Sequence, residues 1–201
     1  MIKTIENQVT NTIVIEKSRF ICQLFPVNNE MEAKKILKEI KKSHPKANHH
    51  CYAYLIKKEQ QIIENQSDDG EPAKTAGLPM LEILRHENIV NVLAVVTRYF
   101  GGTLLGTGGL IRAYSKAVKQ ALNFANIKEV SLRYGYLINV DYSLYNIVEY
   151  EIRKFSGIIK DIKYGEEVMI TFYIIAPDFI NYLQDKVNNK IKITILDSEY
   201  L

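Results

Sequence analysis

The last third of the chain, residues 128–201, alternates strand and helix patterns in an order that few folds accommodate. The segment "VSLRYGYLINVDY" is typical of a strand, and "LYNIVEYEIRKFSG" of a helix that ends at Gly157. "IIKDIKYG" and "EEVMITFYIIA" predict a hairpin around Gly165 and Glu166, Pro177 begins a second helix, and "KITILDSEY" is a last strand. The order β-α-β-β-α-β over about 70 residues predicts a ferredoxin-like domain.

The preceding residues, 1–127, show a different mixture of helices and strands. Residues 12–27 predict a strand with a polar break at Glu16–Arg19, and Asn28 or Asn29 is a suitable N-cap for a helix over Glu30–Lys42. Further on we expect a strand "HHCYAYLI" with "QQIIEN" as its partner, a short helix "MLEILRHE", a buried strand "NVLAVVTRYF" and a helix over Leu110–Phe124. The sequence therefore predicts an α+β protein with two domains, residues 1–127 and 128–201.

Composition indicates a globular protein of the cytoplasm. Of the 201 residues, 47% are hydrophobic and 24% are charged, which excludes a disordered chain. No apolar run is long enough to span a bilayer, and the first residues lack the layout of a signal peptide, so we expect no membrane partner. Cys22 and Cys51 form no Cys-x-x-Cys motif, and we expect both to be buried free thiols in a reducing compartment.

Positive charge is concentrated in the first domain. Residues 1–127 carry 17 Lys and Arg against 12 Asp and Glu, whereas residues 128–201 carry 9 against 11. Much of the excess lies on the predicted first helix, whose apolar face is Ala33, Ile36, Leu37 and Ile40. The remaining surface of that helix is a basic patch, a candidate RNA contact or simply a solvated face, formed by Lys34, Lys35, Lys38, Lys41 and Lys42.

Five glycines follow the apolar strand: Gly101, Gly102, Gly106, Gly108 and Gly109. They do not form a Walker A loop, because Thr107 and Gly108 stand where Lys and Ser or Thr are required, and they lack the third glycine of a dinucleotide fingerprint. One interpretation is that they allow backbone turns and close packing. The other is an anion or phosphate contact at a helix N-terminus, assisted by Arg98 and Arg112.

The segment "SDDGEP" places Asp68, Asp69 and Glu71 within four residues. It predicts an Asp-Gly turn, with a hard-cation site as the alternative. His49 and His50 point to opposite faces of a strand and cannot chelate one ion together. We therefore assign no metal, cofactor or catalytic residue, and keep a hydrolytic site using His50 and the carboxylates as an alternative.

Three motifs in succession, "HHCYAY", "SDDGEPAKTAGLPML" and "RYFGGTLLGTGGLIRAY", resemble the YigZ/IMPACT family, in its bacterial two-domain YigZ branch. The resemblance covers essentially the whole chain. The family usually has a small residue and then glycine where this chain has Ala73 and Lys74, so Lys74 is a departure that adds positive charge beside the carboxylates.

The resemblance implies an N-terminal fold like domain 2 of ribosomal protein S five, and a C-terminal domain like domains III and V of elongation factor G. It also implies translation regulation, since the eukaryotic relatives bind a ribosome-associated scaffold and restrain an eIF2 kinase. Bacteria lack that pathway. The family offers no established catalytic residues to transfer, and the fold by itself does not define a function.

The leading hypothesis is a non-enzymatic cytoplasmic protein that binds RNA, the ribosome or a translation-associated protein. The alternatives are a metal-dependent hydrolase or phosphoryl-transfer enzyme at the His/Asp-Asp/Gly-loop cleft, and a protein-binding adaptor with Tyr52, Tyr54, Tyr99 and Phe100 as exposed anchors. The candidate binding surface comprises His50, Tyr52, Asp68, Asp69, Glu71, Thr75, Arg98, Tyr99, Gly101, Gly102, Gly106, Gly108, Gly109 and Arg112.

Overall fold

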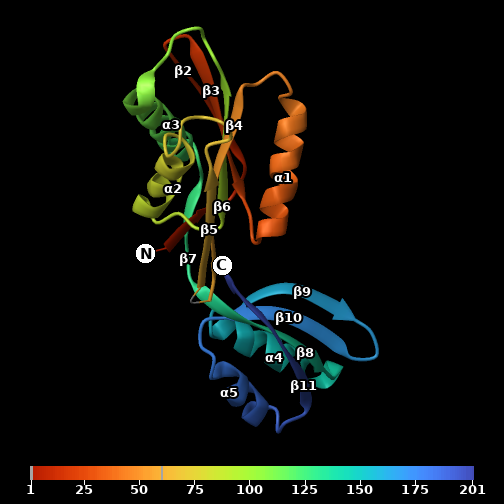
Figure 1. Cartoon of the computed structure of the whole chain (residues 1–201). Helices are drawn as coiled ribbons and strands as arrows, with labels where there is room; N and C mark the ends of the chain where they lie inside the picture. The colour runs from red at the N-terminus through yellow and green to blue at the C-terminus, as the bar shows by residue number, and fades with distance from the viewer. Residues whose placement is uncertain (1, 60) are drawn as a thin grey trace. The chain divides into compact units, whose positions relative to one another are not determined.

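The structure is a computed structural model that describes residues 2–59 and 61–201 (Figure 1). The chain divides into two compact units, one that extends to Val130 and one from Ser131 to Leu201. None of the helices in the described residues is long and apolar enough to cross a membrane.

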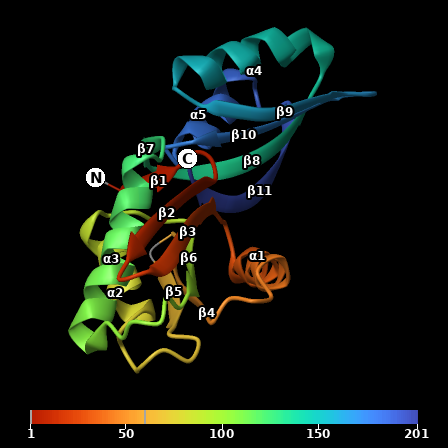
Figure 2. The same cartoon turned by 90° about the horizontal axis from the view of Figure 1, so that it is seen from above.

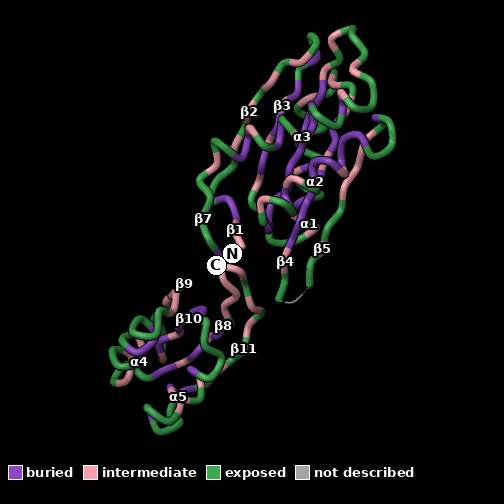
Figure 3. The backbone as a smooth tube through the Cα atoms, turned by 90° about the vertical axis from the view of Figure 1, so that its left-hand side faces the viewer, coloured by how far each residue is buried: buried purple, intermediate pink, exposed green. Residues whose placement is uncertain are grey.

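The first unit is built on a five-stranded antiparallel sheet in the order β2-β3-β6-β4-β5. Helix α1 covers one face of this sheet, and α2 and α3 pack on the other (Figures 1 and 2). The edge strands β2 and β5 are exposed or half-buried, green and pink in Figure 3, whereas β6 in the middle is buried along nearly its whole length. The bounds are β2 Val9–Ile15, β3 Ser18–Pro26, α1 Glu30–Ser43, β4 His49–Lys58, β5 Gln61–Ser67, α2 Gly77–His86, β6 Val92–Tyr99 and α3 Gly106–Asn123.

Local sequence signals account for the start of this unit. The polar break in the first predicted strand is a tight turn between β2 and β3, in which Glu16 and Lys17 have φ of 45° and 62°. Asn29 caps α1 by accepting a hydrogen bond from the backbone N–H of Glu32, and the Glu32 carboxylate accepts one from the N–H of Asn28. This reciprocal pair satisfies the N–H of Glu32, which the helix N-terminus leaves free, and the N–H of the residue before the cap, in the manner of a capping box.

Two segments far apart in the sequence complete the first unit. Strand β1 (Ile2–Ile5) pairs antiparallel with β7 (Ile127–Val130), and Ile2 lies opposite Val130. Residues 128–130, which we expected at the start of the second domain, are therefore paired within the first unit.

Helix α3 begins earlier than its pattern predicts. We expected it to begin at Leu110, but it begins at Gly106 and takes three of the five glycines into its first turn. The expected start was wrong because glycine carries a low intrinsic helix propensity, which packing overrides here. Leu110, Ala113, Tyr114 and Ala117 form the buried stripe that anchors the helix against the sheet.

The second unit has the predicted ferredoxin-like topology. Its four antiparallel strands lie in the order β11-β8-β10-β9, and the two helices and the strands share one apolar core around Ile138, Ile152, Phe172 and Leu183. The elements are β8 Leu132–Val140, α4 Tyr142–Lys154, β9 Ile158–Tyr164, β10 Val168–Ile174, α5 Phe179–Lys186 and β11 Ile191–Tyr200.

Candidate functional site

The three sequence motifs meet at one end of the five-stranded sheet. Strand β4 begins with the first motif, β6 ends in the third, and His49 lies opposite Arg98 in the register between them. The second motif forms the loop between β5 and α2 and the first turn of α2. Because side chains alternate along a strand, the sheet divides the motif residues between its two faces.

On the face covered by α2 and α3, Arg98 and Glu71 form a buried ion pair. Nη1 of Arg98 donates to Oε1 of Glu71 at 2.6 Å, and the hydroxyl of Tyr114 donates to the same oxygen at 2.7 Å. Nη2 of Arg98 lies 3.3 Å from the Ser18 hydroxyl, and its guanidinium lies 5.3 Å from the ring centre of Phe20. Since each charge already has a partner, neither is free to bind a ligand in this conformation.

The thiol of Cys51 extends this buried network. It donates to the backbone oxygen of Asp68 at 3.0 Å and lies 3.3 Å from the hydroxyl of Tyr114. Burial raises the pKa values of the Cys51 and Cys22 thiols, so both remain protonated. Both cysteines are free and buried, as predicted.

Asp68 fixes the start of α2. Its carboxylate accepts hydrogen bonds from the backbone N–H groups of Lys74, Ala76 and Gly77, at 2.8, 2.9 and 2.9 Å. Ala76 is the N-cap and Gly77 the first residue of α2, so two of these donors lie at the helix N-terminus, and no side chain at the N-cap position supplies an acceptor. Asp68 therefore acts as the cap of α2, which favours the turn interpretation of the acidic motif.

Lys74 has a left-handed backbone conformation, with φ of 63°. A side chain is strained in this region, and glycine is not. The conformation explains why a glycine suits this position. A lysine here lowers the stability of the fold relative to glycine, because its backbone is strained. The side chain is exposed.

On the face covered by α1, Asp69 joins the motif loop to that helix. Its carboxylate accepts a hydrogen bond from Nζ of Lys41 at 2.8 Å and one from the backbone N–H of His50 at 2.7 Å. Partial burial acts to raise the pKa of Asp69, but these two hydrogen bonds and the charge of Lys41 outweigh it and lower the pKa. Burial lowers the pKa of His50, with the Asp69 carboxylate opposing it.

The remaining motif residues are held in separate places. The hydroxyl of Tyr99 forms a hydrogen bond with Nδ1 of His44 at 2.9 Å. Thr75 is buried, and its hydroxyl donates a hydrogen bond to the backbone oxygen of Pro72. Gly101 is required by close packing, because a Cβ there would lie 2.0 Å from the backbone of Lys17. Gly102 and Gly106 have positive φ.

Gly109 and Arg112 line a hollow on the α3 side. It measures about 560 Å³ and includes Leu104, Leu105, Gly109, Arg112 and Lys116. Gly108 faces only the tip of the Arg112 side chain, so no steric contact within the described residues explains it. Arg112 is exposed whereas Arg98 is paired with Glu71, so the two arginines do not act on one anion here.

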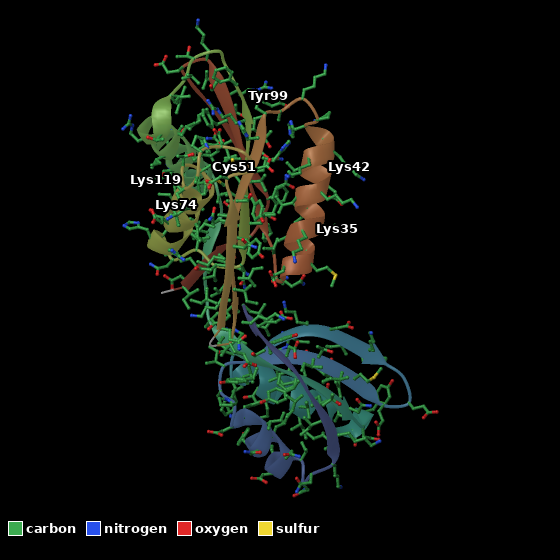
Figure 4. The ribbon with its side chains drawn as sticks, in the orientation of Figure 1. Lys35, Lys42, Cys51, Lys74, Tyr99 and Lys119 are labelled. Atoms are coloured by element: carbon green, nitrogen blue, oxygen red, sulfur yellow. The ribbon has the colours of Figure 1, made fainter. Side chains whose placement is uncertain are left out.

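The basic patch lies beside the Asp69 contact. A shallow groove of about 480 Å³ runs between α1 and β4, and we call it the lysine groove; it is lined by Lys34, Leu37, Lys38, Lys41, Lys42 and Tyr52. Figure 4 shows Lys35 and Lys42 along α1, on the other side of the sheet from Lys74 and Lys119. The sequence predicted the row of lysines but not the groove, because Leu37 lies on α1 and Tyr52 on β4, and sequence spacing does not show that these elements pack together.

The histidines of the first motif lie next to the carboxylates of the second. The histidine and carboxylate motifs do converge, with Nδ1 of His50 3.7 Å from Asp69 and Nε2 of His49 3.8 Å from Glu71. However, in the described part of the chain no three His, Cys, Asp or Glu side chains are grouped so that they could hold a metal ion. Of the four aromatic residues considered as adaptor anchors, Tyr54 is buried and Phe100 is exposed.

Taken together, fold and site define a two-unit α+β protein whose signature motifs form a buried hydrogen-bond network beside a lysine-lined groove. The family described as the Impact N-terminal domain matches residues 16–122, and a domain of unknown function, DUF1949, matches residues 138–189. The chain belongs to the IMPACT family, as the motifs predicted.

Individual relatives agree with this assignment. The IMPACT family member YvyE of Bacillus subtilis is 41% identical, over 98% of this chain and 92% of its own length. The IMPACT family member YigZ of Escherichia coli is 37% identical, over 81% of this chain and 80% of its own. A solved structure described as a crystal structure of an hypothetical protein is 32% identical, covers 98% of both chains and superimposes with a TM-score of 0.67.

Proposed function

We propose that this protein is a non-enzymatic, cytoplasmic translation factor that binds RNA, free or in the ribosome, through the lysine groove. The observation that carries the proposal is that four lysine side chains converge on one groove, that only Lys41 among them forms an ion pair with a described residue, and that none of the described residues lining the groove is acidic. Such a surface attracts the phosphate backbone, whose neutralisation by lysines dominates the affinity of proteins for nucleic acids.

The state of the acidic residues supports binding rather than catalysis. Asp68 is occupied by three backbone N–H groups, and Glu71 by Arg98 and Tyr114. A general base or a metal ligand needs free lone pairs directed at the substrate or ion. Because the hydrogen bonds to Asp68 and to Oε1 of Glu71 all come from groups of the fold itself, these carboxylates are better explained as the supports that hold the motif loop.

Membership in the IMPACT family supports the connection with translation, since the resemblance implies regulators of protein synthesis among the eukaryotic relatives. The likeness of the second unit to domains of elongation factor G, which the resemblance also implies, would suit a contact with the ribosome. The alternative partner, for the same role in translation, is a translation-associated protein.

Sedimentation with ribosomes tests the proposal. We expect the protein to sediment with purified ribosomes at low salt and to be released as salt rises, because the contact is electrostatic. A variant with Lys34, Lys38 and Lys42 all changed to Gln should remain in the supernatant. The matched control changes three exposed lysines elsewhere, Lys119, Lys160 and Lys190, to Gln and should still sediment. Failure of the folded wild-type protein to associate with ribosomes or with RNA at low salt would refute the proposal.

A further inference from the structure

The lysine groove combines an apolar lining with a charged rim. Its lining consists of the buried Leu37, the ring of the half-buried Tyr52 and the aliphatic stems of the lysines, whose ammonium groups extend toward solvent. A surface that only attracts phosphates needs no aromatic lining. The apolar part therefore indicates a ligand with a flat apolar group as well as negative charge.

Tyr52 is held in a fixed orientation. Its ring is stacked with that of Tyr54, with an interplanar angle of 10° and 6.2 Å between centroids. Tyr54 is itself fixed, because it is buried and its hydroxyl donates to Oε1 of Glu30 on α1 at 2.6 Å. A ring held in this way loses little conformational entropy when a second ring packs against it.

The charges on the rim are regularly spaced. Lys34, Lys38 and Lys42 are four residues apart, so they form one row on α1 with about 6 Å between neighbours along the helix axis. Lys41 is neutralised by Asp69, whereas these three lysines make no ion pair with any described residue. A row of cations at this spacing matches successive phosphates of an extended single strand.

From this arrangement we propose that the lysine groove binds single-stranded RNA, with one unpaired base packed against Tyr52 and the flanking phosphates on Lys34, Lys38 and Lys42. This inference rests on the proposed function and names the form of RNA that the site takes. A groove of about 480 Å³ lies within the size range of small-ligand sites and admits a single nucleotide. In a duplex the bases are paired and stacked on one another. Its phosphates can still contact the lysines, but it has no free base to stack on Tyr52.

The absence of tryptophan in the sequence gives a direct test. The variant Tyr52→Trp, as the full chain, carries a single tryptophan in the groove, and Tyr150→Trp carries one at an exposed position on α4 as the matched control. Each is titrated with a ten-nucleotide single-stranded RNA, with an RNA duplex of the same charge and with polyglutamate. We expect the single strand alone to quench the fluorescence of Tyr52→Trp, and we expect the control to keep its fluorescence unchanged while binding with the same affinity.

A second pair of variants measures the stacking contribution. Tyr52→Leu should weaken binding of the single strand by about 5-fold to 150-fold, because stacking of one base on an aromatic side chain contributes about 1 to 3 kcal/mol. Tyr52→Phe should retain the affinity. Urea unfolding of both variants checks that the fold is intact.

The outcomes separate this inference from the proposed function. If RNA binds but the duplex binds as tightly as the single strand and Tyr52→Trp shows no quenching, the inference is wrong and the proposed function stands. Quenching by polyglutamate as strong as that by RNA identifies an acidic peptide as the ligand and also overturns the inference. Absence of binding to any RNA refutes both.

Discussion

Arg98 on β6 and Glu71 in the loop before α2 form an ion pair with 2.6 Å between Nη1 and Oε1, and both side chains are less than a tenth exposed. The pair joins the second and third sequence motifs, and the hydroxyl of Tyr114 on α3 donates a hydrogen bond to the same carboxylate oxygen. The signature of the family therefore holds the sheet, the motif loop and α3 together.

Breaking this pair should destabilise the protein strongly. Glu71→Gln leaves the charge of Arg98 buried without a counter-charge, and we expect a loss of about 3 to 5 kcal/mol in the free energy of unfolding by urea. The matched control is Glu64→Gln, which breaks the exposed pair between Glu64 and Arg85 and should cost less than about 1 kcal/mol. Equal losses in the two variants would show that the buried pair has no special role.

Two glycines of the third motif should respond to alanine in opposite directions. At Gly108, near the start of α3, a Cβ meets only the end of Arg112 at 3.6 Å, so Gly108→Ala should stabilise the fold by about 0.5 kcal/mol. At Gly101 a Cβ would collide with the backbone of Lys17, so Gly101→Ala should destabilise the fold by about 1 to 3 kcal/mol. Thermal unfolding of both variants measures the effects, and a shift of the same sign in both contradicts the packing described.

Lys74 offers a test of backbone strain. Lys74→Gly should raise the free energy of unfolding by about 0.5 kcal/mol, because relief of the left-handed conformation exceeds the entropy that glycine costs. The same change at Lys35, an exposed residue within α1, should lower it by about 1 kcal/mol. Destabilisation by Lys74→Gly would mean that the lysine side chain itself contributes to the loop.

His50 should make stability depend on pH near neutrality. Burial lowers its pKa from the ordinary value of 6.5, whereas the Asp69 carboxylate and the hydrogen bond with the His44 backbone act to raise it, and the charges of Lys41 and His44 lower it slightly further. The unfolded chain then binds the proton more readily, so stability is fully present above pH 6.5 and is lost as the pH falls toward the lowered pKa. His50→Gln should flatten this part of the profile in urea unfolding between pH 7.5 and 5. An unchanged slope would contradict the burial of His50 as the cause.

Asp69 affects stability in a separate, more acidic pH range. Its pKa is lowered from the ordinary value of 3.8, so stability depends on its protonation only below that pH. Its contribution is present above that value and is lost as the pH falls through the lowered pKa, so the two residues can be distinguished in one titration.

Local patterns in the sequence predicted most of the elements and the topology of the second unit. The Asn29 cap, the break at Glu16 and Lys17 and the hairpin at Gly165 each rest on a few neighbouring residues, which is the range over which sequence signals are dependable. The start of α3 was missed because the low helix propensity of glycine argued against a helix there, and tertiary packing overrides that propensity.

The site was less predictable, because its contacts join distant residues. Ser18, Glu71, Arg98 and Tyr114 meet in one network, although sequence order gives no distance between them. The period-2 pattern of "HHCYAY" carried one usable signal, since it places Tyr52 and Cys51 on opposite faces of the sheet. That signal could have separated the lysine groove from the buried network in advance.

The salt dependence of RNA binding tests the central claim most directly. The slope of log Kd against log salt concentration for a single-stranded RNA should fall by about 2 when Lys34, Lys38 and Lys42 are changed to Gln, since each lost phosphate contact removes about 0.7. The control with Lys119, Lys160 and Lys190 changed to Gln carries the same net charge and should keep the wild-type slope. Equal slopes in the two triple variants would contradict the account, because RNA would then respond only to the net charge of the protein and not to the lysine groove.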